Sequence, residues 1–283
     1  IVSGSNSATE VSSTFKAIEA GALAVISRPP GLDHENYDSA SGELIQTVKL
    51  MSEVKVVKRI PDLARNRKAA LLPFTQVYKT EDGIQIAAIG SSTGGPAALL
   101  QILSALPGDL SFPILLVQHI AAGFIKGFAE WLNKSSNIPV RIAQQGEPLI
   151  SGHVYIAPDN YHMGVSKNQQ ILLSDHAPLN GLRPSVAFLF SSVTQVFGPH
   201  AIGVLLTGMG RDGADELKIM KERGAITIAQ DKESSVVHGM PGEAIKIGAA
   251  THILPPEGIA AMLADFNKPQ KEVDNACQKK GCK

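Results

Sequence analysis

The feature that most constrains the fold is a serine between glycines, placed where an apolar segment meets a helix-like segment. Residues 84–89 form an apolar run of strand length, and residues 96–106 have the composition and spacing of a helix. Between them, residues 90–94 read Gly-Ser-Ser-Thr-Gly and match the spacing G-x-S-x-G. Small residues let the backbone turn sharply, so that the middle serine, Ser92, is exposed between strand and helix. Free N–H groups at the helix start favour negative charge on a bound oxygen.

The same segment has a second interpretation, in which a helix N-cap and a glycine-rich loop bind a phosphate group. The dinucleotide-binding spacing G-x-G-x-x-G is not met, because Ser92 stands where the second glycine should be. We therefore favour a nucleophilic role for Ser92.

Composition excludes several classes of protein. The chain has 283 residues, enough for a large core, and its 26 basic residues balance its 26 acidic residues, which argues against a nucleic-acid partner. The apolar runs are too short to span a membrane, and no secretory leader opens the sequence. Cys277 and Cys282 lie in a lysine-rich tail, where we expect neither a metal site nor a disulfide. These features predict a cytoplasmic protein. Its first residue is Ile rather than Met, and we expect the chain to begin partway through a longer one.

Composition and periodicity divide the chain into four regions. Residues 1–57 alternate strand, helix, strand and helix, and residues 58–82 have the basic, proline-containing composition of a linker. Residues 83–267 alternate short apolar strands with helices, which predicts a doubly wound, mainly parallel α/β sheet. Three short strands within 153–174, separated by turn residues, predict an antiparallel hairpin insertion. Residues 268–283 form a polar tail.

A serine hydroxyl attacks poorly unless a base removes its proton, and a carboxylate usually orients that base. His119 follows the run Ile-Leu-Leu-Val-Gln and therefore ends a strand at the sheet edge that also carries Ser92. Asp212 lies in a glycine-rich turn after another apolar strand, residues 201–206. A serine, a histidine and an aspartate at three strand ends predict a catalytic triad at this edge.

The order of these residues differs from that of the α/β-hydrolases, in which the acid precedes the histidine. A hydrolase-like alternative pairs Asp212 with His238 or His252, and residue order alone leaves this alternative open.

Residues 84–266 resemble the catalytic domain of the chemotaxis protein-glutamate methylesterases, the CheB type. The motifs that carry the resemblance are Ala-Ile-Gly-Ser-Ser-Thr-Gly-Gly95, Val117-Gln-His119, Tyr155-Ile-Ala-Pro-Asp-Asn-Tyr-His162, Arg183-Pro-Ser185, Leu206-Thr-Gly-Met-Gly-Arg-Asp-Gly213 and Gln230-Asp-Lys-Glu-Ser-Ser-Val-Val-His-Gly-Met-Pro241. The family's nucleophile falls on Ser92, its histidine on His119 and its aspartate on Asp212. His238 stands where the family commonly has Tyr, which argues against His238 as the base.

The resemblance implies removal of methyl groups from glutamyl esters on the cytoplasmic domains of methyl-accepting chemoreceptors, and in some members deamidation of receptor glutamines. It implies a site lined by Thr93, Gly94 and Met209, with the Thr93 backbone N–H as an oxyanion donor. This chemistry needs neither a metal nor an organic cofactor. A catalytically silent binding module remains an alternative. A transcriptional regulator would need a basic recognition helix, which nothing after residue 84 supplies.

Residues 1–29 resemble the fourth strand, fourth helix and fifth strand of a response-regulator receiver domain. The segment Lys16-Ala-Ile-Glu-Ala-Gly-Ala-Leu-Ala-Val-Ile-Ser-Arg-Pro29 carries this resemblance. Ser3 matches the hydroxyl residue that contacts the phosphoryl group, whereas Arg28 replaces the family's lysine. We find no counterpart of the phosphoacceptor Asp in this chain. A full-length member would receive its phosphoryl group from a chemotaxis histidine kinase. Two short strands and two helices bury little surface, so we expect residues 1–57 to be locally unstable.

Overall fold

The computed structural model describes residues 2–3, 8–23, 25–34, 37–53 and 83–267. Its centre is a seven-stranded sheet with the order β11-β10-β9-β3-β4-β6-β5, in which every neighbouring pair is parallel. The strands are β3 (Ile86–Ser91), β4 (Ile114–Gln118), β5 (Val140–Ile142), β6 (Val154–Ile156), β9 (Ala201–Leu205), β10 (Ile226–Gln230) and β11 (His252–Leu254). From β3 the chain builds first one half of the sheet and then the other, so the strand order reverses between β3 and β9. The predicted doubly wound sheet is confirmed.

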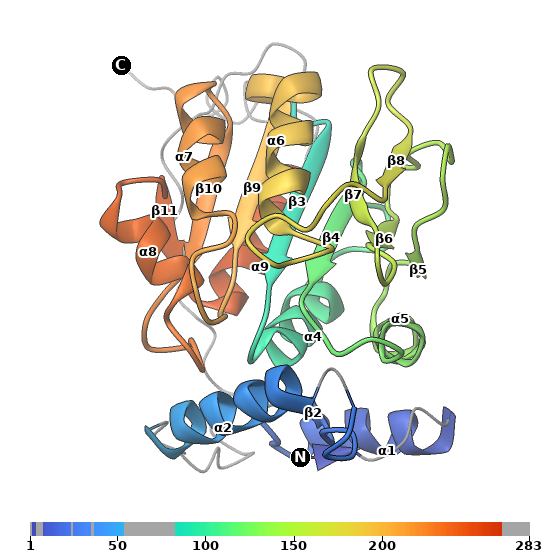
Figure 1. The fold of residues 1–283 in the computed structure, drawn as a ribbon. Coiled ribbons are helices and arrows are strands. Elements are labelled where there is room, and N and C mark those ends of the chain that lie inside the picture. The colour runs from blue at the N-terminus through green and yellow to red at the C-terminus, as the bar shows by residue number, and fades with distance from the viewer. Residues whose placement is uncertain (1, 4–7, 24, 35–36, 54–82, 268–283) are drawn as a thin grey trace, which may run out of the picture.

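Helices cover both faces of this sheet (Figure 1). One face carries α4 (Gly95–Ala105), α5 (Ile125–Ser135) and α9 (Pro256–Asp265), and the other carries α6 (Val186–Phe197), α7 (Ala214–Glu222) and α8 (Met240–Lys246). A single 3-10 turn, η1 (Gly198–His200), connects α6 to β9. Every residue of β3, β4, β9 and β10 is buried, because these strands are packed on both faces. This burial explains why their sequences are apolar runs rather than alternating patterns.

The hairpin insertion consists of β7 (His162–Val165) and β8 (Ile171–Ser174), which pair antiparallel as predicted. The prediction was wrong in placing the preceding strand, residues 153–157, in the same unit. That strand is β6, which pairs in parallel with both β4 and β5 in the main sheet. All of its residues are buried, as in an interior strand. The edge strands β5 and β11 were not predicted, because three residues each are too few to give a periodic signal.

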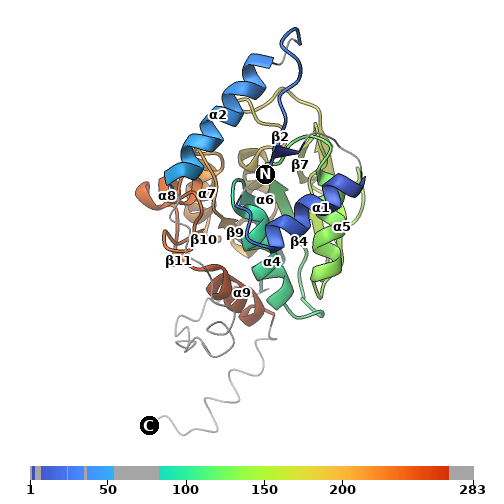
Figure 2. The ribbon, with the colours of Figure 1, turned by 90° about the horizontal axis from the view of Figure 1, so that it is seen from below.

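The N-terminal region follows the predicted order of strand, helix, strand and helix. Its elements are β1 (Val2–Ser3), α1 (Ala8–Glu19), β2 (Ile26–Ser27) and α2 (Tyr37–Glu53), with β1 and β2 paired in parallel. In both views, α1 and α2 lie at the edge of the sheet where its strands end (Figures 1 and 2). The predicted linker, residues 58–82, and nearly all of the predicted tail, residues 268–283, lie outside the described residues.

An aromatic cluster holds α1 against α5. The ring of Phe15 is 1% exposed and stacks on Trp131 with a centroid distance of 5.2 Å. The ring centroid of Phe128 lies 5.7 Å from that of Phe15 and 6.1 Å from that of Trp131, so the three rings form one cluster. The Trp131 indole N–H also donates a hydrogen bond of 2.6 Å to a carboxylate oxygen of Glu19. The local instability of residues 1–57 stays a prediction, but this contact gives α1 a stabilising partner that the sequence alone did not reveal.

This cluster generates a direct test with an intrinsic probe. Trp131 is the single tryptophan of the chain and is 9% exposed. Phe15→Ala removes a buried aromatic ring, which in a protein core costs about 3–5 kcal/mol. We expect α1 to detach and the emission maximum of Trp131 to shift to longer wavelength. Lys16→Ala, at an exposed position of the same helix, is the matched control and should leave the spectrum unchanged. Identical spectra for both variants would contradict the docking role of Phe15.

Candidate active site

The three residues predicted to form a triad follow three neighbouring strands. Ser92 follows β3, His119 follows β4, and Asp212 lies in the turn between β9 and α7. Because β4, β3 and β9 are adjacent and parallel, their carboxyl ends meet at one edge, beside the point where the strand order reverses. A cavity of about 630 Å³ opens there, and Ser92 and His119 both line it.

The backbone around Ser92 has the tight turn that the glycine spacing predicted. A Cβ atom on Gly90 would lie 2.3 Å from the side chain of Val186, so only glycine lets β3 pass the start of α6. Gly94 has a φ of 83° at the N-cap of α4, a conformation that favours glycine. On the other side, a Cβ atom on Gly208 would lie 2.7 Å from the Ser92 Cβ. Close packing on both sides therefore fixes the position of Ser92.

His119 and Asp212 are in direct contact. The His119 Nε2 lies 3.1 Å from the Asp212 Oδ2, and the side chains are 14% and 3% exposed. This distance is that of an ion pair, although the ring N–H does not point at the carboxylate well enough for a hydrogen bond. With Nε2 facing the carboxylate, Nδ1 is the ring nitrogen left to accept a proton from a substrate or from Ser92.

The Asp212 carboxylate is held by the N-terminus of α6. Its Oδ2 accepts a hydrogen bond of 2.7 Å from the backbone N–H of Val186, and its Oδ1 accepts one of 3.1 Å from Ala187. These N–H groups belong to the first turn of the helix, where the positive end of the helix dipole stabilises an anion. Nearby, the pKa of Glu216 is raised, first by burial and then by the negative charges of Asp212 and Asp215. The two backbone hydrogen bonds distinguish Asp212 from a simple turn former.

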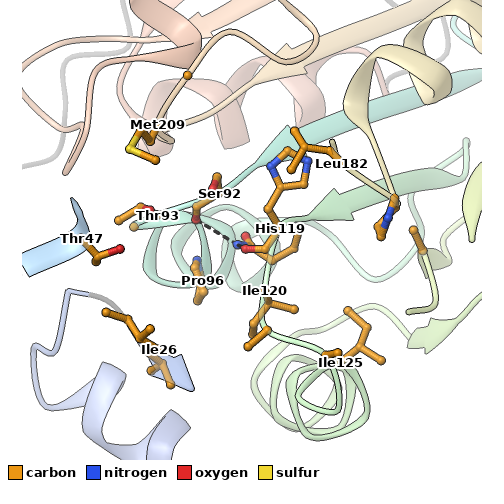
Figure 3. A pocket seen from close by; sticks show the side chains of 18 of the residues that line it. Ile26, Thr47, Ser92, Thr93, Pro96, His119, Ile120, Ile125, Leu182 and Met209 are labelled. Carbon is orange, nitrogen blue, oxygen red and sulfur yellow. Dashed lines mark hydrogen bonds between the residues drawn. The ribbon is translucent and has the colours of Figure 1, made fainter. Parts of the chain in front are cut away.

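Three further residues that the sequence analysis assigned to the site can be placed relative to this cavity. Thr93, Gly94 and Met209 line the cavity together with Ser92. Figure 3 shows Met209 across from Ser92 and His119, while Ile26 and Thr47 approach from the N-terminal region. The Thr93 carbonyl accepts a hydrogen bond of 2.9 Å from the Thr207 hydroxyl, which fixes that peptide. Within the described part of the chain, the Thr93 N–H and the Ser92 Oγ make no hydrogen bond to another protein atom, so both are available to a ligand.

The two alternative histidines are poorly placed for the role of base. His238 does not line the cavity, and its Nδ1 lies 3.4 Å from the Ser235 Oγ. The pKa of His238 is lowered, chiefly by burial and then by the charge of Lys232. His252 begins β11, three strands away from β3, which at the usual strand spacing is on the order of 14 Å. Asp212 therefore meets His119 and neither alternative.

The sequence interpretation missed Gln118 and did not foresee the surroundings of Ser91. Ser91 is fully buried, and its hydroxyl donates a hydrogen bond of 2.6 Å to the Gln118 side-chain oxygen. A polar residue closing an otherwise apolar strand was the available signal for Gln118. The loop residues Asn180, Leu182 and Arg183 also line the cavity, and only the Arg183-Pro-Ser185 motif pointed to them. Among the described residues, no group of three or more His, Cys, Asp or Glu side chains is placed to hold a metal ion.

A serine, a histidine and a buried aspartate at neighbouring strand ends of a doubly wound sheet define the class of α/β serine hydrolases. Comparison with known proteins narrows this class. The family model described as CheB methylesterase matches residues 87–263. The chain therefore belongs to the CheB methylesterase family.

Individual relatives agree with this assignment. A protein of Nitrosospira multiformis named protein-glutamate methylesterase/protein-glutamine glutaminase is 52% identical over 94% of this chain and 75% of its own length. A protein of Geobacter metallireducens named protein-glutamate methylesterase/protein-glutamine glutaminase 4 is 54% identical over 94% of this chain and 76% of its own length. The crystal structure of the Thermotoga maritima CheB methylesterase catalytic domain matches with a TM-score of 0.63 and 38% identity, covering 65% of this chain and 98% of that one.

None of the helices in the described ranges is long and apolar enough to cross a membrane.

The contact between Asp212 and α6 predicts that Asp212→Asn destabilises the protein as well as the site. An asparagine amide has one acceptor oxygen, so it would leave the N–H of Val186 or Ala187 facing an NH₂ group. An unsatisfied buried N–H costs about 1–3 kcal/mol, which a denaturant titration should detect as a lower free energy of unfolding. Asp215→Asn is the matched control, because Asp215 lies three residues further along the chain and its side chain is exposed. This variant should leave the free energy of unfolding nearly unchanged. Equal unfolding curves for the two variants would contradict the anchoring of Asp212 by α6.

Proposed function

We propose that this chain is a protein-glutamate methylesterase that hydrolyses methyl esters on glutamyl side chains of chemoreceptors and also deamidates receptor glutamines. The observation that carries the proposal is the convergence of Ser92, His119 and Asp212 on three adjacent strand ends in a chain of the CheB methylesterase family. The names of its relatives support both activities.

The first half of the reaction forms an acyl-enzyme. The Ser92 Oγ attacks the ester carbonyl while the His119 Nδ1 accepts its proton, and the Asp212 carboxylate stabilises the resulting imidazolium. The free N–H of Thr93 donates a hydrogen bond to the oxyanion of the tetrahedral intermediate. When this intermediate collapses, the bond from carbon to the methoxy oxygen breaks. His119 returns the proton to that oxygen, and methanol leaves.

The second half releases the glutamate. A water molecule gives a proton to His119 and attacks the acyl-enzyme carbonyl. When the second tetrahedral intermediate collapses, the bond from carbon to the Ser92 oxygen breaks and His119 returns the proton to that oxygen. The carboxylic acid that forms releases its own proton to the solvent. The products are a glutamate carboxylate and the free enzyme. A glutamine substrate follows the same route, except that ammonia leaves in the first half. One site therefore serves both substrates, and both reactions yield the same residue.

The partners follow from this chemistry. The substrates are the methylated glutamates and the glutamines on the cytoplasmic domains of chemoreceptors, which places the enzyme in the cytoplasm. Residues 1–57 are the C-terminal part of a receiver domain, joined through the linker 58–82 to the catalytic domain 83–267. In a full-length family member a chemotaxis histidine kinase would supply the phosphoryl group. Methanol release from a methylated receptor fragment is the decisive assay, since a silent binding module would bind the fragment and release none.

The two adjacent serines provide a first test. We expect Ser92→Ala to abolish methanol release, because it removes the attacking oxygen. Ser91→Ala should reduce the rate by less than about tenfold, since it removes one hydrogen bond worth about 1 kcal/mol. Both variants are measured at equal concentration of folded protein. If Ser91→Ala loses all activity while Ser92→Ala remains active, the nucleophile is Ser91 and our assignment of Ser92 is wrong.

The histidines provide a second test. His119→Ala should lower kcat on the order of a thousandfold, because no other group can take the serine proton. His238→Ala should lower kcat far less, since that ring lies outside the cavity. Steady-state kinetics with the same receptor fragment measure both variants. If the large loss occurs in His238→Ala instead, the base is His238.

A further inference from the structure

Gln118 links the strand that carries the serine to the strand that carries the histidine. It is the last residue of β4, is 3% exposed and lines the same cavity as Ser92 and His119. We propose that Gln118 is a positioning residue that fixes the distance between the nucleophile and its base. This inference rests on the proposed function, in which Ser92 attacks and His119 accepts the proton.

All the polar atoms of the Gln118 side chain are engaged with the two strand ends. Its Nε2 donates a hydrogen bond of 2.9 Å to the Ser92 carbonyl (Figure 3) and one of 2.8 Å to the His119 carbonyl. Its Oε1 accepts the 2.6 Å bond from the Ser91 hydroxyl. One amide therefore holds the nucleophilic residue, the residue before it and the base.

These bonds begin where the sheet ladder stops. The last backbone rung between the two strands is the 2.9 Å bond from the His119 N–H to the Ser91 carbonyl. Beyond this bond, the segment after β3 leads into α4 and the segment after β4 enters a loop. No further backbone pairing therefore holds these two segments together. The Gln118 amide extends the pairing by one step, at the level of the two reactive residues.

Gly95 leaves the space that the Gln118 side-chain amide occupies. A Cβ atom on Gly95 would lie 2.2 Å from the Gln118 Oε1 and 2.8 Å from the Ser91 Cβ. The glycine that follows the G-x-S-x-G turn is therefore required by the glutamine. The requirement is also chemical, because only a side chain with two N–H donors and one acceptor satisfies two carbonyls and one hydroxyl at once.

A second glutamine shows that such an amide can be purely structural. Gln230 ends β10, is fully buried, and accepts a hydrogen bond of 2.8 Å from the Thr207 N–H while it donates to Ser234. It contacts neither Ser92 nor His119. The test of Gln118 must therefore separate an effect on reactivity from an effect on stability.

The primary variant is Gln118→Met, which keeps the length of the side chain and removes all three hydrogen bonds. We expect kcat for methanol release to fall about 100-fold, the effect of a displacement of about 1 Å at a reacting centre, with KM changed less than twofold. The rate at which a small sulfonyl fluoride labels Ser92 should fall by the same factor, because labelling needs the same base but no receptor.

The stability control is Thr227→Val, which removes buried hydrogen bonds of 2.7 Å and 3.0 Å far from the cavity. We expect it to lower the melting temperature by an amount similar to Gln118→Met while kcat stays within twofold. The inference is overturned if both variants lose activity in proportion to their loss of stability, or if Gln118→Met labels at the rate of the unaltered protein.

Gln118→Glu keeps the native shape and gives a second, independent readout. As a carboxylate it would present no donor to the two carbonyls, whereas its protonated form donates one hydrogen bond. We therefore expect the pH optimum of kcat to move to lower pH in this variant. An unshifted optimum would overturn the positioning role. If the unaltered chain releases no methanol, the proposed function fails. The role of Gln118 is then judged by the labelling rate of Ser92 alone.

Discussion

The close approach of the α6 N-terminus to the ends of β3 and β9 is the constraint on which the site depends. Val186 packs where a Cβ atom on Gly90 or Gly213 would lie, at 2.3 Å and 2.4 Å, so glycine is required both in β3 and at the N-cap of α7. This contact brings the free N–H groups of α6 to the Asp212 carboxylate, which in turn reaches His119. The orientation of the acid is thus set by the same packing that closes the core.

Beyond the strand ends, hydrogen bonds from side chains replace the backbone hydrogen bonds that link neighbouring strands. Gln118 joins β3 to β4, and Gln230 joins β10 to the turn after β9. The Thr207 hydroxyl donates to the Thr93 carbonyl at 2.9 Å and accepts from the Val237 N–H at 3.0 Å. Each group has partners for its donors and acceptors, which rigidifies a buried polar network. These hydrogen bonds hold the loops around Ser92 in place beyond the ends of the strands.

The sequence predicted the parts of this architecture that depend on local patterns. Apolar runs of five or six residues gave the central strands, and the G-x-S-x-G spacing gave the turn at Ser92. It could not predict the edge strands, which are too short to show a period, or the pairing of β6, which depends on its neighbours in space. For the same reason Gln118 was missed, because its partners in β3 lie 26 and 27 residues away. The wall that Ile26 and Thr47 add to the cavity also depends on how two distant segments pack.

Ser91 and Ser92 show that placement, rather than residue type, determines chemical role in this site. The two hydroxyls have the same intrinsic chemistry and belong to neighbouring residues. Ser91 ends the strand, so its side chain is fully buried and its proton is committed to Gln118. Ser92 lies one residue further, where the turn carries its side chain to the cavity beside His119. A one-residue shift of β3 would carry both serines out of their present environments, because successive side chains of a strand point to opposite faces. The register of β3 against β4 and β9 is therefore what selects the nucleophile.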